Sequence, residues 1–448
     1  MGLKQIFTEA TFATYIKAIK SPREVIYNRK LLLTVALYAT SGIPISSSSS
    51  MPSLPGFQHD FGITSATNPT QVSSFISFVY MGAGIGSGLS LFLNDRIGRL
   101  WAYRLYMAIW IVGQIITTAS MGNLGVLYFA CIVSGLGILE LIVTGPASIV
   151  EIVLAEVRSL LAVWFSVAML LSLTVSVFTV YASFLHVAVG QTQYQVVFFA
   201  PTIVMKLFIM ASFLLYESPR GNPQPNGARG LPIHHPRVAH EVENIKEQIV
   251  KEEEKLGRNP RFTVLIKDAF QVPPNLRRFQ QAVLSYALAQ LSGANSVTFY
   301  LVPISFLFTL SASFLFIDAL GHRRSLFTGI AIQIISDVYI GVFVKYRQAG
   351  SVAPGSGEAA IAAVFIHGIR VSPLVLPYVP GAKLWLNHLR SFGSAFAQFF
   401  HWLFFFGVNK GMPSLLSWCF LSLMYVYCVV PETSLQGLEQ LDELFKGP

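Results

Sequence analysis

The sequence predicts an all-α integral membrane protein built from two six-helix units, and three observations support this fold class. Charged residues make up 12% of the chain and hydrophobic residues 53%, whereas soluble globular proteins are roughly 25% charged. Several apolar runs reach the roughly 18 to 20 residues that cross a bilayer. The charged stretch 95–99 recurs roughly half a chain later at 318–324, a self-similarity typical of transporters made of two related bundles.

The first unit is predicted to cover residues 31–216, after a polar and basic segment at 1–30. Apolar runs place its spans near 31–50, 70–93, 101–119, 124–148, 159–185 and 195–216. Gly42, Pro44 and a serine run interrupt the first of them, because Pro lacks a backbone donor and Ser competes for backbone carbonyls. Either a kink that lines a cavity or an early helix end explains this interruption.

Four glycines alternate in the second predicted span, at positions 82, 84, 86 and 88. A glycine-rich phosphate loop requires a preceding strand, whereas these glycines lie inside an apolar helix. We therefore expect them to allow close packing between helices.

A polar linker is predicted at 217–278, with an amphipathic helix near 242–256. The second unit covers 279–431 and is followed by a tail at 432–448. Its spans are expected near 280–300, 302–320, 324–345, 359–381, 391–408 and 412–431. The eighth span is expected to be short, because the seventh and eighth crossings together have only about forty residues.

The net charge of +9 follows the topology. Lys and Arg gather before the first span and in the linker, while segments 51–69, 120–123 and 186–194 contain none. The positive-inside rule therefore predicts that both termini and the linker are cytoplasmic, and the charge does not indicate nucleic acid as a partner. The three cysteines lie in apolar runs, and no Cys or acidic residue accompanies His234 and His235. We expect neither a metal nor a cofactor.

Several motifs occur in a fixed order along the chain. They are Asp95 to Arg99, Pro146 to Glu151 with Arg158, Glu217 to Arg220, Gln290 to Asn295, Asp318 to Arg324, and Pro431 to Thr433 with Asp442 to Phe445. From about Tyr27 to Phe445 the chain resembles the sugar porter branch of the major facilitator superfamily, in particular fungal hexose and quinate permeases. The resemblance implies the major facilitator fold, a small-molecule substrate and no covalent chemistry.

The charged motif residues lie at predicted cytoplasmic helix ends, where opposite charges can bridge helices and break as the bundles rock. The resemblance makes them a gating network, although they could instead be topological flanks. The residues are Asp95, Arg96, Arg99, Glu151, Arg158, Glu217, Arg220, Asp318, Arg323, Arg324 and Glu432.

The resemblance also implies a substrate site around the seventh span. Amide side chains both donate and accept hydrogen bonds, so Gln290 and Asn295 suit the hydroxyls of a sugar or cyclitol. The other positions implied are Phe299, Tyr300, Trp402 and Ser166. This chain has Phe405 where a polar residue is common in the eleventh span, so its pocket is expected to be less polar than a hexose site.

Charges inside predicted spans indicate function, because burying charge in a membrane is costly. The acidic residue that proton-coupled relatives carry in the first span is missing. Glu140 and Asp337 are the candidate proton sites, and Lys206 and Arg370 are further charges inside spans.

The sequence therefore predicts a sugar-porter-type transporter in the plasma membrane, surrounded by lipid bilayer and monomeric. Its cargo would be a sugar, a cyclitol, a quinate-like acid or a related small organic molecule. Two alternatives share the fold: a transport-inactive or sensor-like relative, and an exporter of a fungal secondary metabolite. An integral membrane enzyme is disfavoured because the chain has no HExxH or GxSxG motif.

Overall fold

The computed structural model describes residues 28–46, 54–63, 69–153, 161–162, 164–214, 243, 247, 250, 254, 257, 262–291, 322–348, 355–369, 385–386, 389–410 and 415–430. Every regular element in these ranges is a helix. The elements are α4 (Arg29–Ala39), η1 (Thr40–Ser46), α5 (Pro55–Phe61), α6 (Pro69–Ile97), α7 (Arg99–Thr118), α8 (Leu124–Ile152), α10 (Trp164–His186), α11 (Gln191–Ser212), α14 (Phe262–Gln271), α15 (Pro273–Leu291), α18 (His322–Gln348), α19 (Ser356–Ile369), α22 (Arg390–Lys410) and α23 (Leu415–Cys428).

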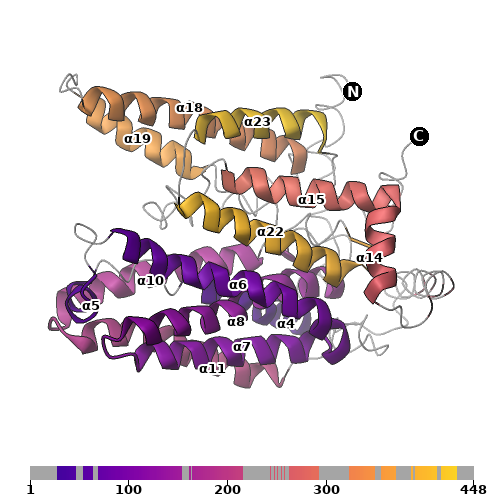
Figure 1. Ribbon diagram of the computed structural model, residues 1–448, viewed down its shortest axis with the longest axis horizontal. Helices are drawn as coiled ribbons and strands as arrows, with labels where there is room; N and C mark the ends of the chain where they lie inside the picture. Colours follow the sequence, from indigo (N-terminus) through magenta and orange to yellow (C-terminus); the bar gives the residue numbers. More distant parts are fainter. Residues whose placement is uncertain are drawn as a thin grey trace.

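The helices of the first half lie together, and those of the second half are stacked above them (Figure 1). α22 lies nearest to the first half, because it packs along α6 as well as α15. α18, α19 and α23 form a separate layer on the far side of α15 (Figure 1). α22 is therefore the described helix of the second half that makes extensive contact with the first.

Five described helices are long and apolar enough to cross a membrane: α7, α8, α10, α11 and the stretch Leu326–Arg347 of α18. Their ranges coincide with the third to sixth and ninth predicted spans. α15 begins at Pro273, earlier than the seventh span was expected to begin. The expected eighth span near 302–320 lies outside the described residues.

The interrupted first span continues through its Gly-Pro segment as the 3-10 helix η1. η1 packs against α10, and a Cβ atom on Gly42 would lie 3.0 Å from the Cβ of Met169. The lack of a side chain at Gly42 therefore permits this close approach. The α-helix therefore ends early, at Ala39, but the chain continues as a 3-10 helix, an arrangement that neither explanation offered by the sequence described.

The glycines of α6 separate into two faces. A Cβ atom on Gly82 would meet the backbone of Ile132 in α8, and one on Gly86 would lie 2.7 Å from the carbonyl oxygen of Leu136. Gly84 and Gly88 have no such neighbour within 4 Å. The predicted packing role is thus confirmed for Gly82 and Gly86 alone.

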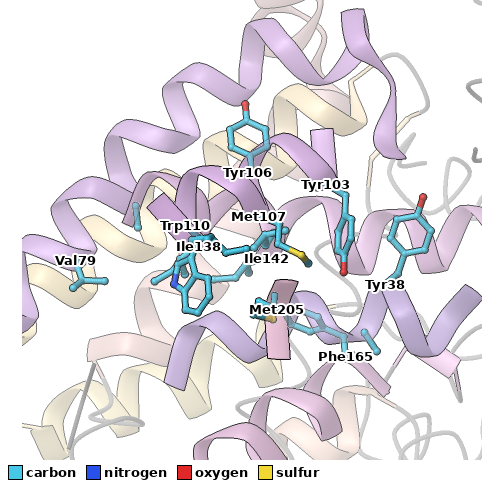
Figure 2. Packing of buried hydrophobic residues seen from close by; sticks show 14 of the residues in the cluster. Tyr38, Val79, Tyr103, Tyr106, Met107, Trp110, Ile138, Ile142, Phe165 and Met205 are labelled. Atoms are coloured by element: carbon cyan, nitrogen blue, oxygen red, sulfur yellow. The ribbon is translucent and has the colours of Figure 1, made fainter. Parts of the chain in front are cut away.

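The core of the first half includes buried residues of α4, α6, α8, α10 and α11 that gather near α7 (Figure 2). Trp110 and Met107 of α7 are fully buried there against Ile138 of α8 and Met205 of α11. Packing in this core fixes the position of α8, and the last turn of α8 carries a side chain of the candidate functional site.

Candidate functional site

Glu151 joins two arginines at one end of the helices. Its Oε1 lies 3.3 Å from Nη2 of Arg99 and 3.3 Å from Nη1 of Arg390. Arg390 also donates from Nη2 to the carbonyl oxygen of Trp385, 3.4 Å away. The side chains of Glu151 and Arg390 are each 1% exposed. A buried carboxylate is therefore shared between two guanidinium groups.

The positions of these charges oppose the helix dipoles. Glu151 lies in the last turn of α8, where the backbone carbonyls are negative, while Arg99 and Arg390 begin α7 and α22, where the amides are positive. Each placement is unfavourable by about 0.3–1 kcal/mol. Helix stability therefore does not account for these residues, and their mutual attraction offsets the cost.

The cluster links the two halves of the chain. Arg99 and Glu151 come from the first half, and Arg390 is 239 residues further along than Glu151. The sequence motifs identified Arg99 and Glu151 but not Arg390. The sequence signal that could have identified Arg390 is its position at the very start of an apolar helix. Its partner could not be identified in this way, because the partner depends on how the two halves pack.

A second group of polar residues lies buried between α15 and α22. The amide nitrogen of Gln290 is 3.1 Å from each ring nitrogen of His401. The ring of Tyr286 contacts His401 edge-on with centroids 5.1 Å apart, and its hydroxyl accepts from the amide of Gln398 at 3.2 Å. The spacing of Gln398 and His401 places both on one face of α22. The predicted substrate residue Gln290 thus lies in a polar seam.

Aromatic rings enclose this seam toward the first half. Trp402 stacks on Tyr80 of α6, with centroids 5.1 Å apart and an interplanar angle of 17°. Phe405 contacts Tyr80 edge-on at 4.2 Å, and the ring of His401 lies 5.0 Å from that of Trp402. Rings of this kind provide flat apolar surface next to polar groups. Next to the polar seam, the contact between α6 and α22 is therefore made by aromatic rings.

His401, Tyr286, Gln398 and Tyr80 were not identified from the sequence. His401 could have been found as an ionisable group in an apolar helix, which by default suggests function. Phe405 occupies the position where the family resemblance predicts a polar residue, and the polar side chain of His401 lies one turn earlier in the same helix.

The two remaining described candidates belong to other helices. Ser166 of α10 is fully buried, and its hydroxyl has no hydrogen-bond partner among the described residues. Asp337 of α18 accepts from Gln333 at 3.2 Å and lies 3.8 Å from Sγ of Cys419 in α23. Asp337 is thus on the outer layer of the second half.

Other predicted residues cannot be assigned contacts. Only the backbone is described for Asp95 and Arg96 in α6, Glu140 in α8, and Arg323 and Arg324 in α18. The following lie outside the described residues: Arg158, Glu217, Arg220, Asn295, Phe299, Tyr300, Asp318, Arg370 and Glu432.

Known proteins resemble the chain in both sequence and fold. The family model described as "Sugar (and other) transporter" matches residues 41–445. A quinate permease of Emericella nidulans is 22% identical over 95% of this chain and 90% of its own length. A quinate permease of Neurospora africana is also 22% identical, over 96% of this chain and 91% of its own.

Solved structures give the same fold. The proton:xylose symporter XylE bound to 6-bromo-6-deoxy-D-glucose superposes with a TM-score of 0.78 at 17% identity, covering 95% of this chain and 100% of that one. XylE from E. coli in an inward-open conformation gives a TM-score of 0.66 at 17% identity, covering 94% and 99%. XylE is described as a member of the major facilitator superfamily.

Proposed function

Because the chain belongs to the sugar (and other) transporter family, and is therefore a multi-pass membrane transporter of the sugar porter type, we propose that it moves a small polyhydroxylated or weakly acidic molecule by alternating access. The observation that carries this proposal is the seam of Gln290 and His401 between α15 and α22. An amide and an imidazole together offer donors and acceptors to hydroxyl or carboxylate groups. No covalent step is required.

The cargo would lie between the polar seam and the aromatic rings. Gln290 and His401 would replace the water that hydrates its polar groups, while Trp402 would cover an apolar face of its ring. Ser166, Asn295, Phe299 and Tyr300 remain proposed contributors on the basis of the family resemblance. Sugars, cyclitols and quinate-like acids all present this combination of a compact ring with several oxygens.

The cluster of Arg99, Glu151 and Arg390 would serve as the cytoplasmic gate. In the described conformation Glu151 connects the two halves, and alternating access would require this connection to break when the halves rock apart. The other charged motif residues would complete the network. We place both termini and the linker 217–278 in the cytoplasm and the transporter in the plasma membrane as a monomer, in agreement with the distribution of Lys and Arg.

Glu140 and Asp337 remain the proposed proton sites. Asp337 accepts an amide hydrogen bond from Gln333. If Asp337 carries the coupled proton, Asp337→Asn abolishes the dependence of uptake on the pH gradient. Unchanged gradient dependence would assign coupling elsewhere.

Ligand-induced thermal stabilisation tests the cargo site directly. Hexoses, pentoses and quinate are added to the purified protein, since a ligand that binds the native state raises its melting temperature. Gln290→Ala removes a hydrogen bond of about 1–3 kcal/mol, so the ligand concentration required should rise by about 5-fold to 150-fold. Gln114→Ala is the control, because Gln114 is equally buried but bonds to Ser134 within the first half. Equal shifts in both variants would contradict the assigned site.

Counterflow in proteoliposomes then distinguishes transport from sensing. A transporter exchanges labelled cargo against unlabelled cargo on the opposite side, whereas a transport-inactive sensor binds without exchange. Exchange that is lost in Gln290→Ala and retained in Gln114→Ala supports the proposed function.

A further inference from the structure

A crevice of about 350 Å³ lies between α10 and α11, away from the polar seam. Its walls follow one face of each helix over three turns, from Ala168 to Thr179 on α10 and from Val197 to Phe208 on α11. Its floor is formed by Thr40 and the neighbouring Ile43 of η1. The crevice thus extends from the surface between the two helices to the interrupted part of the first span.

Three of the four hydroxyl groups that line the crevice donate to backbone carbonyls. These hydroxyls and their acceptor carbonyls are Thr40 to Leu37 at 2.6 Å, Ser172 to Ile43 at 3.1 Å, and Thr179 to Val175 at 2.7 Å. The other lining side chains are mainly aliphatic, including Ala200 and Val204. A polar cargo would gain little there, because these three hydroxyls already have acceptors. The walls instead suit hydrocarbon.

The crevice is elongated. Eleven residue steps of α-helix extend roughly 16 Å, so the crevice runs along the two helices for about that length. An elongated apolar groove suits an extended hydrocarbon chain.

The position of the crevice identifies the source of such a chain. α10 and α11 are both long and apolar enough to span a membrane, and Val175 at the crevice edge is 55% exposed. Thr40 lies roughly 16 Å along the first span from Arg29, which is about half of a hydrocarbon core roughly 30 Å thick. At that depth, the surrounding solvent is lipid acyl chains.

We propose that one acyl chain of a membrane phospholipid occupies this crevice and packs behind η1. The acyl chain covers the apolar surfaces of α10 and α11 that face each other across the crevice without touching. It also packs against the 3-10 helix of the first span from the membrane side. This site is separate from the proposed cargo site and does not depend on the identity of the cargo.

Native mass spectrometry with added phosphatidylcholine tests the proposal. Ala200→Phe fills the crevice from the α11 wall and Ala168→Phe from the α10 wall. Leu207→Phe is the matched control, because Leu207 is 64% exposed on α11 and does not line the crevice. The wild type and Leu207→Phe should each retain one phosphatidylcholine after detergent exchange. Both crevice-filling variants should retain at least tenfold less.

Three results would overturn the proposal. The first is a wild-type protein that retains no phospholipid, which decides the question even if a large side chain prevents a variant from folding. The second is equal retention by wild type and both crevice-filling variants. The third is displacement of phosphatidylcholine by an equal concentration of ergosterol, which would make a sterol the occupant.

Discussion

Glu151→Gln should release the two halves from each other. The substitution keeps the size of the side chain but removes the carboxylate that lies 3.3 Å from Arg99 and from Arg390. Arg390, which is 1% exposed, would then remain buried without this counter-charge. Breaking a buried ion pair by removing one partner costs about 3–5 kcal/mol. This cost destabilises the closed conformation relative to the open one, because water solvates the guanidinium group once the halves separate.

The expected change in population follows from this energy. Each 1.4 kcal/mol corresponds to about a tenfold change in an equilibrium constant, so the ratio of closed to open protein should fall at least about 100-fold. Spin labels at Lys30 of α4 and Ile266 of α14 report the change, because both side chains are exposed, α4 belongs to the first half, and α14 packs against α15 of the second half. Double electron–electron resonance should show a second, altered distance in Glu151→Gln that is minor in the wild type.

Arg104→Gln provides the control for a loss of stability without gating. Arg104 donates to the carbonyl oxygen of Ser212 at 2.8 Å and lies over the rings of Trp101 and Phe213, all within the first half. This variant should melt earlier but keep the wild-type distance distribution. If Glu151→Gln also lowers the melting temperature and leaves the distances unchanged, the cluster is a static brace and the gating argument is refuted.

Two further predictions concern glycines at close helix contacts. Gly82→Val should destabilise the protein by about 1–3 kcal/mol, because its side chain would meet the backbone of Ile132. Gly84→Val should have a much smaller effect, because no neighbour among the described residues lies near Gly84. Thermal melting compares the two variants, and equal losses of stability would contradict the packing described. Gly393→Ala should displace the ring of Trp385, whose carbonyl oxygen accepts from Arg390, and should therefore shift the spin-label distances in the same direction as Glu151→Gln. An unchanged distribution would show that Trp385 is not required to position that arginine.

The sequence predicted the helical membrane fold, because apolar length is a local signal, whereas the roles of the site residues rest on the family resemblance and stay predictions. Apolar length identified the spans, and the short connection between α7 and α8 kept Arg99 and Glu151 within one unit. The partner Arg390 could not be predicted, since a bond over 239 residues depends on how one helix of the second half docks on the first. His401 was missed for the same reason: the amide of Gln290 faces it across a helix seam.

Periodicity alone also could not divide the glycines of α6. All four lie in one apolar helix, but at 100° per residue positions 82 and 86 share a face that points to α8 while 84 and 88 do not. Knowledge of the neighbouring helix was needed to separate these roles. The same limit applies to η1, because the sequence identified a break but not the 3-10 geometry that maintains the span.

α22 carries Arg390 and His401 eleven residues apart, which is close to three full turns, so both project from nearly the same side. Adding or deleting a single residue between them would rotate one by about 100° relative to the other and shift it by about 1.5 Å along the axis. The spacing between Arg390 and His401 should therefore keep its length over evolution. Alignments of homologues are expected to contain no gap between these two positions.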